Sequence, residues 1–331
     1  MKAVVLEAAD KPLILRETDR PALKPGEVLV KVKAAALNRR DYWITVGKYA
    51  GIKYPIILGS DGAGVVAEAG DDGDKHLIGR QVIINPGHDW GDHPEFQSKE
   101  FKILGLPEDG TFAEYVRVRS EYLHDKPAHL GWEQAAALPL AGLTAYRALF
   151  TKGKAVKGDK VLITGVGSGT GSFALQFAKA AGCQVFVTSG SGEKIDEAKQ
   201  LGAAAGVNYK AQDWAGQLYH LSGGFDVIID SALGEGFAKL PDLCNPGARI
   251  VFFGGTAGNI PELNGRKIFW KQLQILGTTM GTPEEFAAMV SFVNQHQIVP
   301  VIDEILPLAD AEKAVRKMEH SSQFGKIVLR T

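Results

Sequence analysis

Short apolar segments, separated by clusters of Pro, Gly and Asp, dominate the first third of the chain. They lie at 3–6, 28–32, 65–67, 82–84 and 115–118. Segments of this length between turn-forming residues predict strands in a compact antiparallel barrel or sandwich. The stretch 85–110 is polar and poor in strand-forming residues, so we expect a long surface loop there.

The pattern changes after about residue 127. The segment 132–150 has a helical pattern interrupted by Pro139, and strands and helices then alternate up to about residue 280. We predict strands at 160–164, 184–188, 207–209, 227–230, 249–253 and 274–278, with helices at 172–181, 193–201 and 213–221. This alternation predicts a parallel, doubly wound sheet. The remaining residues return to a mixed pattern, with helices at 283–295 and 309–320 and strands at 299–305 and 326–329.

A glycine-rich turn joins the strand at 160–164 to a helix that we expect to begin near Ser172. It contains Gly165, Gly167, Ser168, Gly169, Thr170 and Gly171. Glycines let the backbone approach a pyrophosphate closely, and the helix N-terminus supplies free N–H groups and a positive dipole end. The strand–turn–helix context therefore predicts a dinucleotide site, the alternative being an ordinary tight turn. Phe253 and Gly254 end a later strand, where ligands bind open α/β sheets.

The residues after the second strand of this region bear on the choice of cofactor. NAD-binding sites usually place Asp or Glu at that strand end, to accept hydrogen bonds from the ribose hydroxyls. Here the strand end carries Ser189 and Ser191, with Lys194 behind them. Hydroxyls and an ammonium suit a 2′-phosphate, so we predict NADPH in preference to NADH. The alternative is that the serines cap a helix and Lys194 is solvated.

Composition narrows the class of protein. The chain has 331 residues, a length typical of two domains, and its net charge of −1 provides no overall field that would attract nucleic acid or an anionic membrane. Cys183 and Cys244 form no metal-binding or disulfide pattern, so we expect packed thiols rather than nucleophiles. No signal peptide or long apolar stretch is apparent, and we expect a cytoplasmic protein.

Eight motifs occur in the order found in one enzyme superfamily. They are AAALNRRDYW at 34–43, PIILGSDGAGVV at 55–66, GTFAEYV at 110–116, AALPLAGLTAYRAL at 136–149, the glycine turn, VIIDSALG at 227–234, VFFGGT at 251–256 and FGKIVL at 324–329. With them the chain resembles the medium-chain dehydrogenase/reductase superfamily, in particular its zinc-free, quinone-oxidoreductase-like branch. The resemblance implies an α/β fold, in which residues 1–126 and 281–331 form a GroES-like β-rich catalytic domain and residues 127–280 a Rossmann domain. It also implies a homodimer or homotetramer, with dimers often pairing through the last Rossmann strand.

The resemblance also bears on metal content. Zinc-dependent members bind catalytic zinc through Cys, His and Cys, and the matching positions here hold Asn38, Ser60 and Leu140. Leucine cannot ligate a metal, and an amide or a hydroxyl is a poor zinc ligand. The four cysteines of a structural zinc lobe are absent from 85–110. His88, Asp89, Asp92 and His93 lie in that stretch, where we prefer a polar surface loop to a metal site. We therefore predict a chain without zinc.

The family's motifs also suggest site residues. Asn38 and Asp41 match an Asn-x-x-Asp pattern, and Tyr49 lies where related reductases present a tyrosine to the cleft. Each of the three has a structural alternative. Asn38 could stabilise the loop through its amide, Asp41 could be a buried acceptor that braces the loop, and the Tyr49 ring could simply pack. Asp61 replaces a glutamate next to the metal ligands of zinc members, and we expect it to be structural.

On the cofactor side, Thr144 resembles a threonine near the nicotinamide, and Tyr209 a tyrosine near the adenosine phosphate. Lys326 resembles a lysine that reaches NADPH, the alternative being a solvated strand lysine. In the glycine turn, Ser168 stands where the branch has glycine, which leaves open which amides contact phosphate.

Without a metal, hydride transfer favours acceptors whose developing enolate or phenolate needs only hydrogen-bond donors. We therefore expect a reductase of quinones or α,β-unsaturated carbonyls that uses NADPH. The alternatives are a zinc-independent alcohol dehydrogenase or aldehyde reductase, and a non-catalytic NADPH-binding protein.

Overall fold

The computed structural model describes residues 1–331, which divide into two compact units. The first unit comprises Met1–Ala141 and Gly281–Thr331, and the second comprises Gly142–Met280. The first segment of the first unit ends at Ala141 rather than at the predicted residue 126, because α2 (Trp132–Ala137) packs against the strands β3 (Glu27–Ala36) and β5 (Asp61–Ala69).

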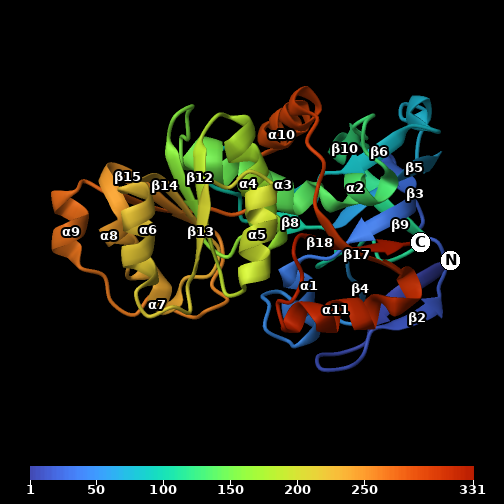
Figure 1. Cartoon of the computed structure of the whole chain (residues 1–331). Coiled ribbons are helices and arrows are strands. Elements are labelled where there is room, and N and C mark those ends of the chain that lie inside the picture. Colours follow the sequence, from blue (N-terminus) through green and yellow to red (C-terminus); the bar gives the residue numbers. More distant parts are fainter. The chain divides into compact units, whose positions relative to one another are not determined.

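A seven-stranded sheet forms the centre of the first unit (Figure 1). Its order is β10 (Leu123–Asp125), β6 (Gln81–Ile84), β5, β3, β18 (Lys326–Arg330) and β17 (Ile302–Pro307), with β9 (Tyr115–Arg119) also paired to β3. All pairs are antiparallel except β17 with β18. Smaller sheets join β2 (Ile14–Glu17), β1 (Lys2–Leu6) and β4 (Ile56–Ile57), and β7 (Gly87–His88) with β8 (Lys102–Ile103). The first unit is β-rich, as predicted.

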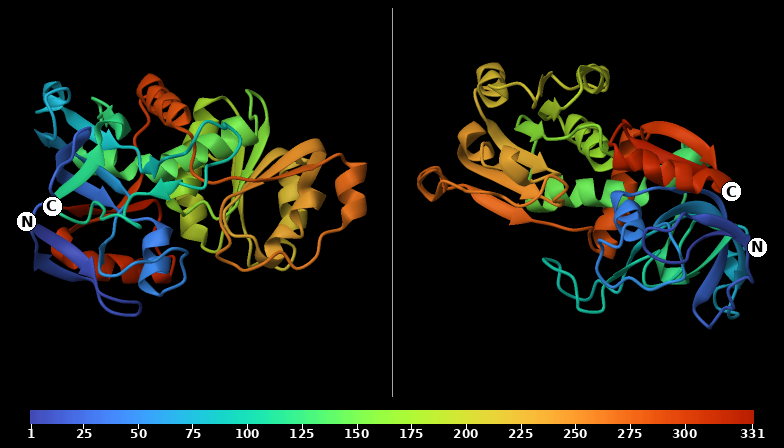
Figure 2. Two further views of the ribbon diagram at one scale, coloured as in Figure 1. Left: turned by 180° about the vertical axis from the view of Figure 1, so that it is seen from behind. Right: turned by 90° about the horizontal axis from the view of Figure 1, so that it is seen from below.

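The C-terminal strand brings distant residues together. β18 runs antiparallel to β3 with Val328 opposite Ala36, and the Leu37 N–H donates to the Ile327 carbonyl at 3.0 Å. This register places the start of β18 beside the start of α1 (Arg39–Thr45), which follows β3. Figure 2 shows the C-terminal strand within the sheet formed by the N-terminal part of the chain. Two further helices, α10 (Pro283–His296) and α11 (Ala311–Glu319), complete the unit.

The second unit contains a six-stranded parallel sheet. Its order is β13 (Ala205–Asn208), β12 (Gln184–Ser189), β11 (Lys160–Ile163), β14 (Phe225–Asp230), β15 (Cys244–Phe252) and β16 (Gln274–Gly277). Helices α4 (Gly169–Ala180), α5 (Gly192–Gln200) and α6 (Trp214–Ser222) pack against it (Figure 1). This is the strand order of a Rossmann fold, and the predicted α/β class is confirmed.

Some element bounds differ from the predictions for local reasons. α4 begins at Gly169 rather than near Ser172, because Ser168 caps the helix. α2 ends at Ala137 and Pro139 begins α3 (Pro139–Tyr146), since proline is tolerated in a first helical turn. A π-helix at Arg147–Lys152 continues α3. The shorter helices α7 (Gly234–Phe237) and α8 (Leu240–Leu243) precede β15, and α9 (Gly265–Trp270) lies between β15 and β16 in the sequence. No helix has the length and apolar character required to cross a membrane.

Candidate active site

The glycine turn forms the start of α4, directly after β11. Gly165 has φ +62°, a left-handed conformation that favours glycine. The Ser168 hydroxyl accepts a hydrogen bond from the Gly171 N–H at 3.0 Å, and the Ser168 N–H donates to the Gly165 carbonyl at 3.1 Å. Ser168 is therefore the N-cap, and Gly169, Thr170 and Gly171 form the first helical turn. This settles the position of the helix start within the glycine turn.

The residues of this turn fit a pyrophosphate. A Cβ added at Gly171 would lie 2.9 Å from Ser168 Oγ and 3.0 Å from both the Gly165 carbonyl oxygen and the Val166 Cα. Only glycine therefore leaves the turn undisturbed at this point. α4 has 12 residues, and the N-terminus of a helix of this length offers N–H donors and a positive potential to a phosphate. Gly167 lies in the same turn and completes the predicted set.

The carboxyl ends of the neighbouring strands β14 and β12 brace the turn. Thr164 Oγ1 donates to Asp230 Oδ2 at 2.6 Å, and Asp230 Oδ1 accepts from the Leu233 N–H at 2.7 Å. The Val166 N–H donates to the Thr188 carbonyl at 3.1 Å. The sheet edge at which dinucleotides bind is thus held by hydrogen bonds between three parallel strands.

The predicted residues for the adenosine end lie around Gly190. Ser189 is buried at the end of β12, and its hydroxyl accepts from the Ser191 N–H at 3.3 Å. The Tyr209 hydroxyl lies over the same turn, because a Cβ added at Gly190 would lie 2.7 Å from its oxygen. Lys194 is half-buried in the first turns of α5. The fold thus brings Ser189, Ser191 and Tyr209 together.

Three other predicted cofactor residues lie away from Gly190, two of them after β15 and one on α3. Phe253 and Gly254 follow the end of β15, where the Phe253 N–H donates to the Asp230 carbonyl at 3.3 Å. A Cβ added at Gly254 would lie 2.4 Å from the Ser231 carbonyl oxygen, so this close approach requires glycine. Thr144 is buried on α3.

A buried polar network connects three predicted residues of the first unit. Lys326 is 3% exposed, and its ammonium donates to Asn38 Oδ1 at 2.7 Å and to Asp61 Oδ2 at 2.8 Å. Asn38 Nδ2 donates to the same Asp61 oxygen at 2.9 Å. The other Asp61 oxygen, Oδ1, accepts from the Leu140 N–H at 2.8 Å. Lys326 is therefore not a solvated strand lysine, and the network fixes both polar atoms of the Asn38 amide.

Asp41 lies fully buried next to this network. Its Oδ2 accepts from the Asn38 N–H at 2.8 Å, while Oδ1 has no hydrogen-bond partner. Burial raises the pKa of Asp41 to about 6, and the nearby Arg40 charge opposes this shift. This carboxylate holds the start of α1, in line with the expectation of a bracing acceptor.

Arg40, which the sequence did not single out, connects two other positions. It is 7% exposed, and its Nη1 donates to Ser60 Oγ at 2.7 Å and to the Leu104 carbonyl at 2.9 Å. Its Nε donates to the Tyr49 hydroxyl at 3.3 Å. No sequence signal distinguishes Arg40 from its neighbour Arg39, because only the tertiary structure buries the side chain.

The three positions that match zinc ligands do not fit a zinc ion. Asn38 Oδ1 accepts from the Lys326 ammonium, and Ser60 Oγ accepts from the Arg40 guanidinium. Leu140 provides no ligand atom. Two side-chain cations contact the oxygens that would otherwise face a metal, and Coulomb repulsion disfavours a dication at this place. No group of three or more His, Cys, Asp or Glu side chains in the chain is arranged to hold a metal ion.

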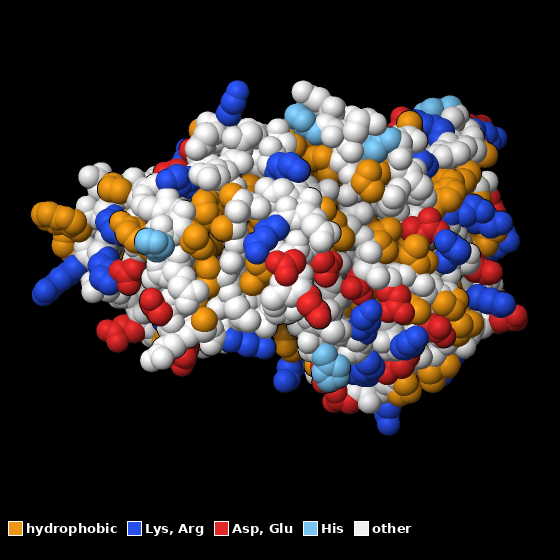
Figure 3. Space-filling view, in the orientation of Figure 1, with side chains coloured by type: hydrophobic (Ala, Val, Ile, Leu, Met, Phe, Trp, Pro, Cys, Tyr) orange, Lys and Arg blue, Asp and Glu red, His pale blue; other side chains and the backbone are white.

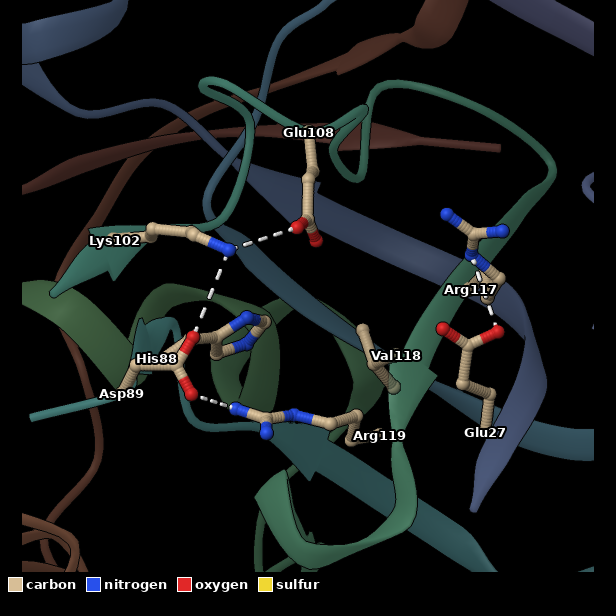
Figure 4. A pocket seen from close by; sticks show the side chains of 8 residues that line it. All are labelled: Glu27, His88, Asp89, Lys102, Glu108, Arg117, Val118 and Arg119. Carbon is tan, nitrogen blue, oxygen red and sulfur yellow. Dashed lines mark hydrogen bonds and ion pairs between the residues drawn. The ribbon is translucent and has the colours of Figure 1, made fainter. Parts of the chain in front are cut away.

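The stretch 85–110 folds as a lobe held by charged side chains. Figure 4 shows a pocket of this lobe, in which Asp89 forms ion pairs with Arg119 and, at 3.7 Å, with Lys102. Lys102 also pairs with Glu108 at 3.3 Å. His88 stacks on the Tyr122 ring at 4.0 Å, and burial lowers its pKa to about 4. The pair between Asp89 and Arg119 thus links the lobe to β9, and Asp89 is already paired with two cations.

The two cysteines are packed thiols. Burial raises the pKa of Cys183 to about 11 and that of Cys244 to about 12. Cys244 Sγ contacts the Leu240 carbonyl at 3.3 Å, and Cys183 Sγ contacts the Val156 carbonyl at the same distance. Thiols with raised pKa values are poor nucleophiles at neutral pH.

Comparisons with known proteins agree with this architecture. The family described as "Alcohol dehydrogenase GroES-like domain" matches residues 24–128, and the one described as "Zinc-binding dehydrogenase" matches residues 169–295. A Leptosphaeria maculans protein named "Zinc-type alcohol dehydrogenase-like protein YogA" is 35% identical, over 96% of this chain and 94% of its own length. A Cereibacter sphaeroides protein named "Crotonyl-CoA carboxylase/reductase" is 28% identical, over 93% of this chain and 81% of its own.

A solved structure supports the same relationship. The crystal structure of an NAD-dependent alcohol dehydrogenase superposes with a TM-score of 0.94 at 36% identity, with complete coverage of both chains. The two-unit architecture thus agrees with relatives that match almost the whole chain. The chain is an oxidoreductase that belongs to the medium-chain dehydrogenase/reductase superfamily.

Proposed function

We propose that the chain is an NADPH-dependent, zinc-independent reductase of quinones or α,β-unsaturated carbonyls, of the quinone-oxidoreductase-like branch. The observation that carries this proposal is the polar network at the three zinc-ligand positions. Lys326 and Arg40 contact the oxygens of Asn38 and Ser60, and Leu140 has no ligand atom. Without a Lewis acid, the site favours acceptors in which the negative charge that develops during hydride addition is delocalised.

The residues divide between cofactor and acceptor. The turn 165–171 binds the pyrophosphate, and Thr144, Phe253 and Gly254 belong to the remaining cofactor surface. When bound, NADPH supplies a hydride to the electron-poor carbon of the acceptor. Tyr49 donates a hydrogen bond and then a proton to the oxygen on which negative charge develops. Asn38 orients the reactants, and Lys326, Asp61 and Asp41 hold its amide and backbone in place.

The preference for NADPH rests on the end of β12. Ser189, Ser191 and Tyr209 surround Gly190, and no carboxylate occupies the strand end to accept from a ribose 2′-hydroxyl. Lys194 adds a positive charge on the following helix. We expect Ser189→Asp to lower kcat/KM for NADPH about tenfold or more while sparing NADH, because a carboxylate repels the 2′-phosphate. An equal loss for both cofactors would contradict this assignment.

The choice of acceptor is supported by one relative. The protein from Cereibacter sphaeroides has crotonyl-CoA in its name, and a crotonyl group is an α,β-unsaturated acyl group. The direct test measures NADPH oxidation by the purified chain with a panel of quinones, enones, saturated aldehydes and ketones. Metal analysis of the same preparation accompanies it. We expect turnover with quinones or enones. We also expect a zinc content below about one tenth of a zinc ion per chain. Stoichiometric zinc would contradict the proposal.

A second candidate is a zinc-independent alcohol dehydrogenase or aldehyde reductase. The names of two relatives, "Zinc-type alcohol dehydrogenase-like protein YogA" and an NAD-dependent alcohol dehydrogenase, favour the alcohol dehydrogenase activity but not its independence from zinc. Turnover with aldehydes or alcohols alone would select this candidate. Tight NADPH binding with no turnover on the whole panel would instead select a non-catalytic NADPH-binding protein.

We also propose that two copies pair through the second unit. β16 is one of the two edge strands of the parallel sheet, and α9 lies just before it in the sequence. Figure 3 shows hydrophobic side chains exposed over α9, where Phe269 is 66% and Trp270 is 82% exposed. An open strand edge and exposed aromatic rings are each typical of a surface that pairs with another chain. A homodimer, or a homotetramer built from it, would cover both features.

A further inference from the structure

The guanidinium of Arg40 is buried and forms no direct ion pair. Arg40 is 7% exposed, and the buried Asp41 carboxylate interacts with its charge without contacting it. Its hydrogen-bond acceptors are the Ser60 hydroxyl, the Leu104 carbonyl and the Tyr49 phenol oxygen, all of them neutral. Burying a charge that contacts only neutral partners is costly, so such an arrangement indicates a functional role for the charge.

The contact with Tyr49 determines where the phenol hydrogen points. Arginine can only donate hydrogen bonds, so the Tyr49 oxygen accepts from Arg40 Nε, and its own hydrogen must point elsewhere. No protein group accepts that hydrogen. The guanidinium carbon also lies 5.0 Å from the centroid of the Tyr49 ring, within the range of a cation–π contact. Tyr49 is therefore presented as a hydrogen-bond donor with a positive charge behind its oxygen.

The other contacts of Arg40 keep the guanidinium in this position. Nη1 donates to the hydroxyl of the fully buried Ser60, just before β5, and to the Leu104 carbonyl of the lobe. The Tyr49 ring packs against the hydrophobic core of the first unit. Since both partners are anchored, the distance between the positive charge and the phenol oxygen is set by the fold.

We propose that Arg40 is a positioning residue that acts through Tyr49: it directs the phenol hydrogen toward the acceptor and stabilises the phenolate left after proton donation. This proposal rests on the proposed function. In the full reaction the acceptor gains a hydride from the cofactor and a proton from Tyr49. The O–H bond of Tyr49 breaks, NADPH becomes NADP⁺, and water returns a proton to the phenolate. Arg40 itself neither gains nor loses a proton.

A double-mutant cycle on the full chain tests the proposal. kcat is measured at saturating NADPH with the best quinone or enone for Arg40→Met, Tyr49→Phe and the double variant. We expect Tyr49→Phe to lower kcat about 100-fold or more and Arg40→Met about tenfold or more. If Arg40 acts through Tyr49, the double variant equals Tyr49→Phe within about twofold. Arg40→Lys, which keeps the charge, should recover part of the loss.

Matched controls separate this role from a structural one. Arg39→Met changes the neighbouring arginine, which bonds to Ser321 and the Met318 carbonyl, and should leave kcat within about twofold of the wild type. The dissociation constant of NADPH should stay within about twofold in every variant. If Arg40→Met fails to fold, Ser60→Ala replaces it, because loss of the Ser60 hydroxyl should lower kcat severalfold in the wild type and not in the Tyr49→Phe background.

Two results would overturn the proposal, and they can be told apart. A loss from Arg40→Met that is equally large in the Tyr49→Phe background would show that Arg40 acts independently of Tyr49. That result would leave the proposed function intact. A wild-type chain that turns over no acceptor on the panel would contradict the proposed function. It would also contradict the role of Arg40, which depends on that function.

Discussion

Replacing Lys326 with methionine should strongly destabilise the first unit. The Lys326 ammonium and the Asp61 carboxylate are 3% and 0% exposed and lie 2.8 Å apart. Removing the lysine charge leaves the Asp61 carboxylate buried, with only the Asn38 amide and the Leu140 N–H as donors. Breaking a buried pair in this way costs about 3–5 kcal/mol. For a domain of this size, about 1 kcal/mol shifts Tm by about 2–4 °C, so we expect a decrease of about 6–20 °C.

Thermal unfolding of the full chain, followed by circular dichroism at pH 7, measures this effect. The control is Lys75→Met, which breaks a pair with Asp72 whose side chains are 65% and 91% exposed. This control should change stability by less than about 1 kcal/mol. Adding Asp61→Asn to Lys326→Met should restore more than half of the loss, since the buried charge is then removed. A Lys326→Met variant as stable as the control, or a double variant no better than the single one, would refute the reasoning.

Three further predictions concern other parts of the molecule. Burial raises the pKa of Asp41 from 3.8 to about 6, so the stabilising contribution of its neutral form is lost as the pH rises through about 6. Asp41→Asn should therefore raise the free energy of unfolding in urea by up to about 3 kcal/mol at pH 8, and equal effects at pH 4 and pH 8 would contradict this. Gly171→Val should weaken NADPH binding about tenfold or more in a fluorescence titration, because its side chain meets Ser168 Oγ and the Gly165 carbonyl, while Gly265→Ala, in open space, should not. Replacing both Phe269 and Trp270 with serine should give a monomer by analytical ultracentrifugation, and a monomeric wild type would rule out the pairing.

Most of the fold could be predicted from the sequence because its signals are local. The alternation of strands and helices after residue 132 depends on periodicity within short segments, and the structure confirms the parallel sheet. The glycine turn was found for the same reason, since its conformation depends on adjacent residues. The exact start of α4 was missed, because Ser168 becomes the cap only when its hydroxyl meets the Gly171 N–H.

The polar network of the first unit was only partly visible in the sequence. Asn38 and Asp41 were selected through one motif and Lys326 through another, and no pattern indicated that Lys326 meets Asn38 and Asp61. Lys326 meets Asn38 across 288 residues and Asp61 across 265. The pairing of β18 with β3 creates this proximity, and hydrophobic periodicity specifies each strand without specifying its partner.

The sequence by itself determined the dinucleotide turn, the parallel sheet and the loss of the three zinc-ligand residues, because each depends on residue type or on neighbours a few positions away. The tertiary structure alone decided which charges are buried and paired. Arg39 and Arg40 are adjacent and chemically identical, yet only Arg40 is enclosed with Ser60, Leu104 and Tyr49. Burial depends on segments that are distant in the chain. It increases both the desolvation cost of a charge and the strength of its interactions with neighbouring groups.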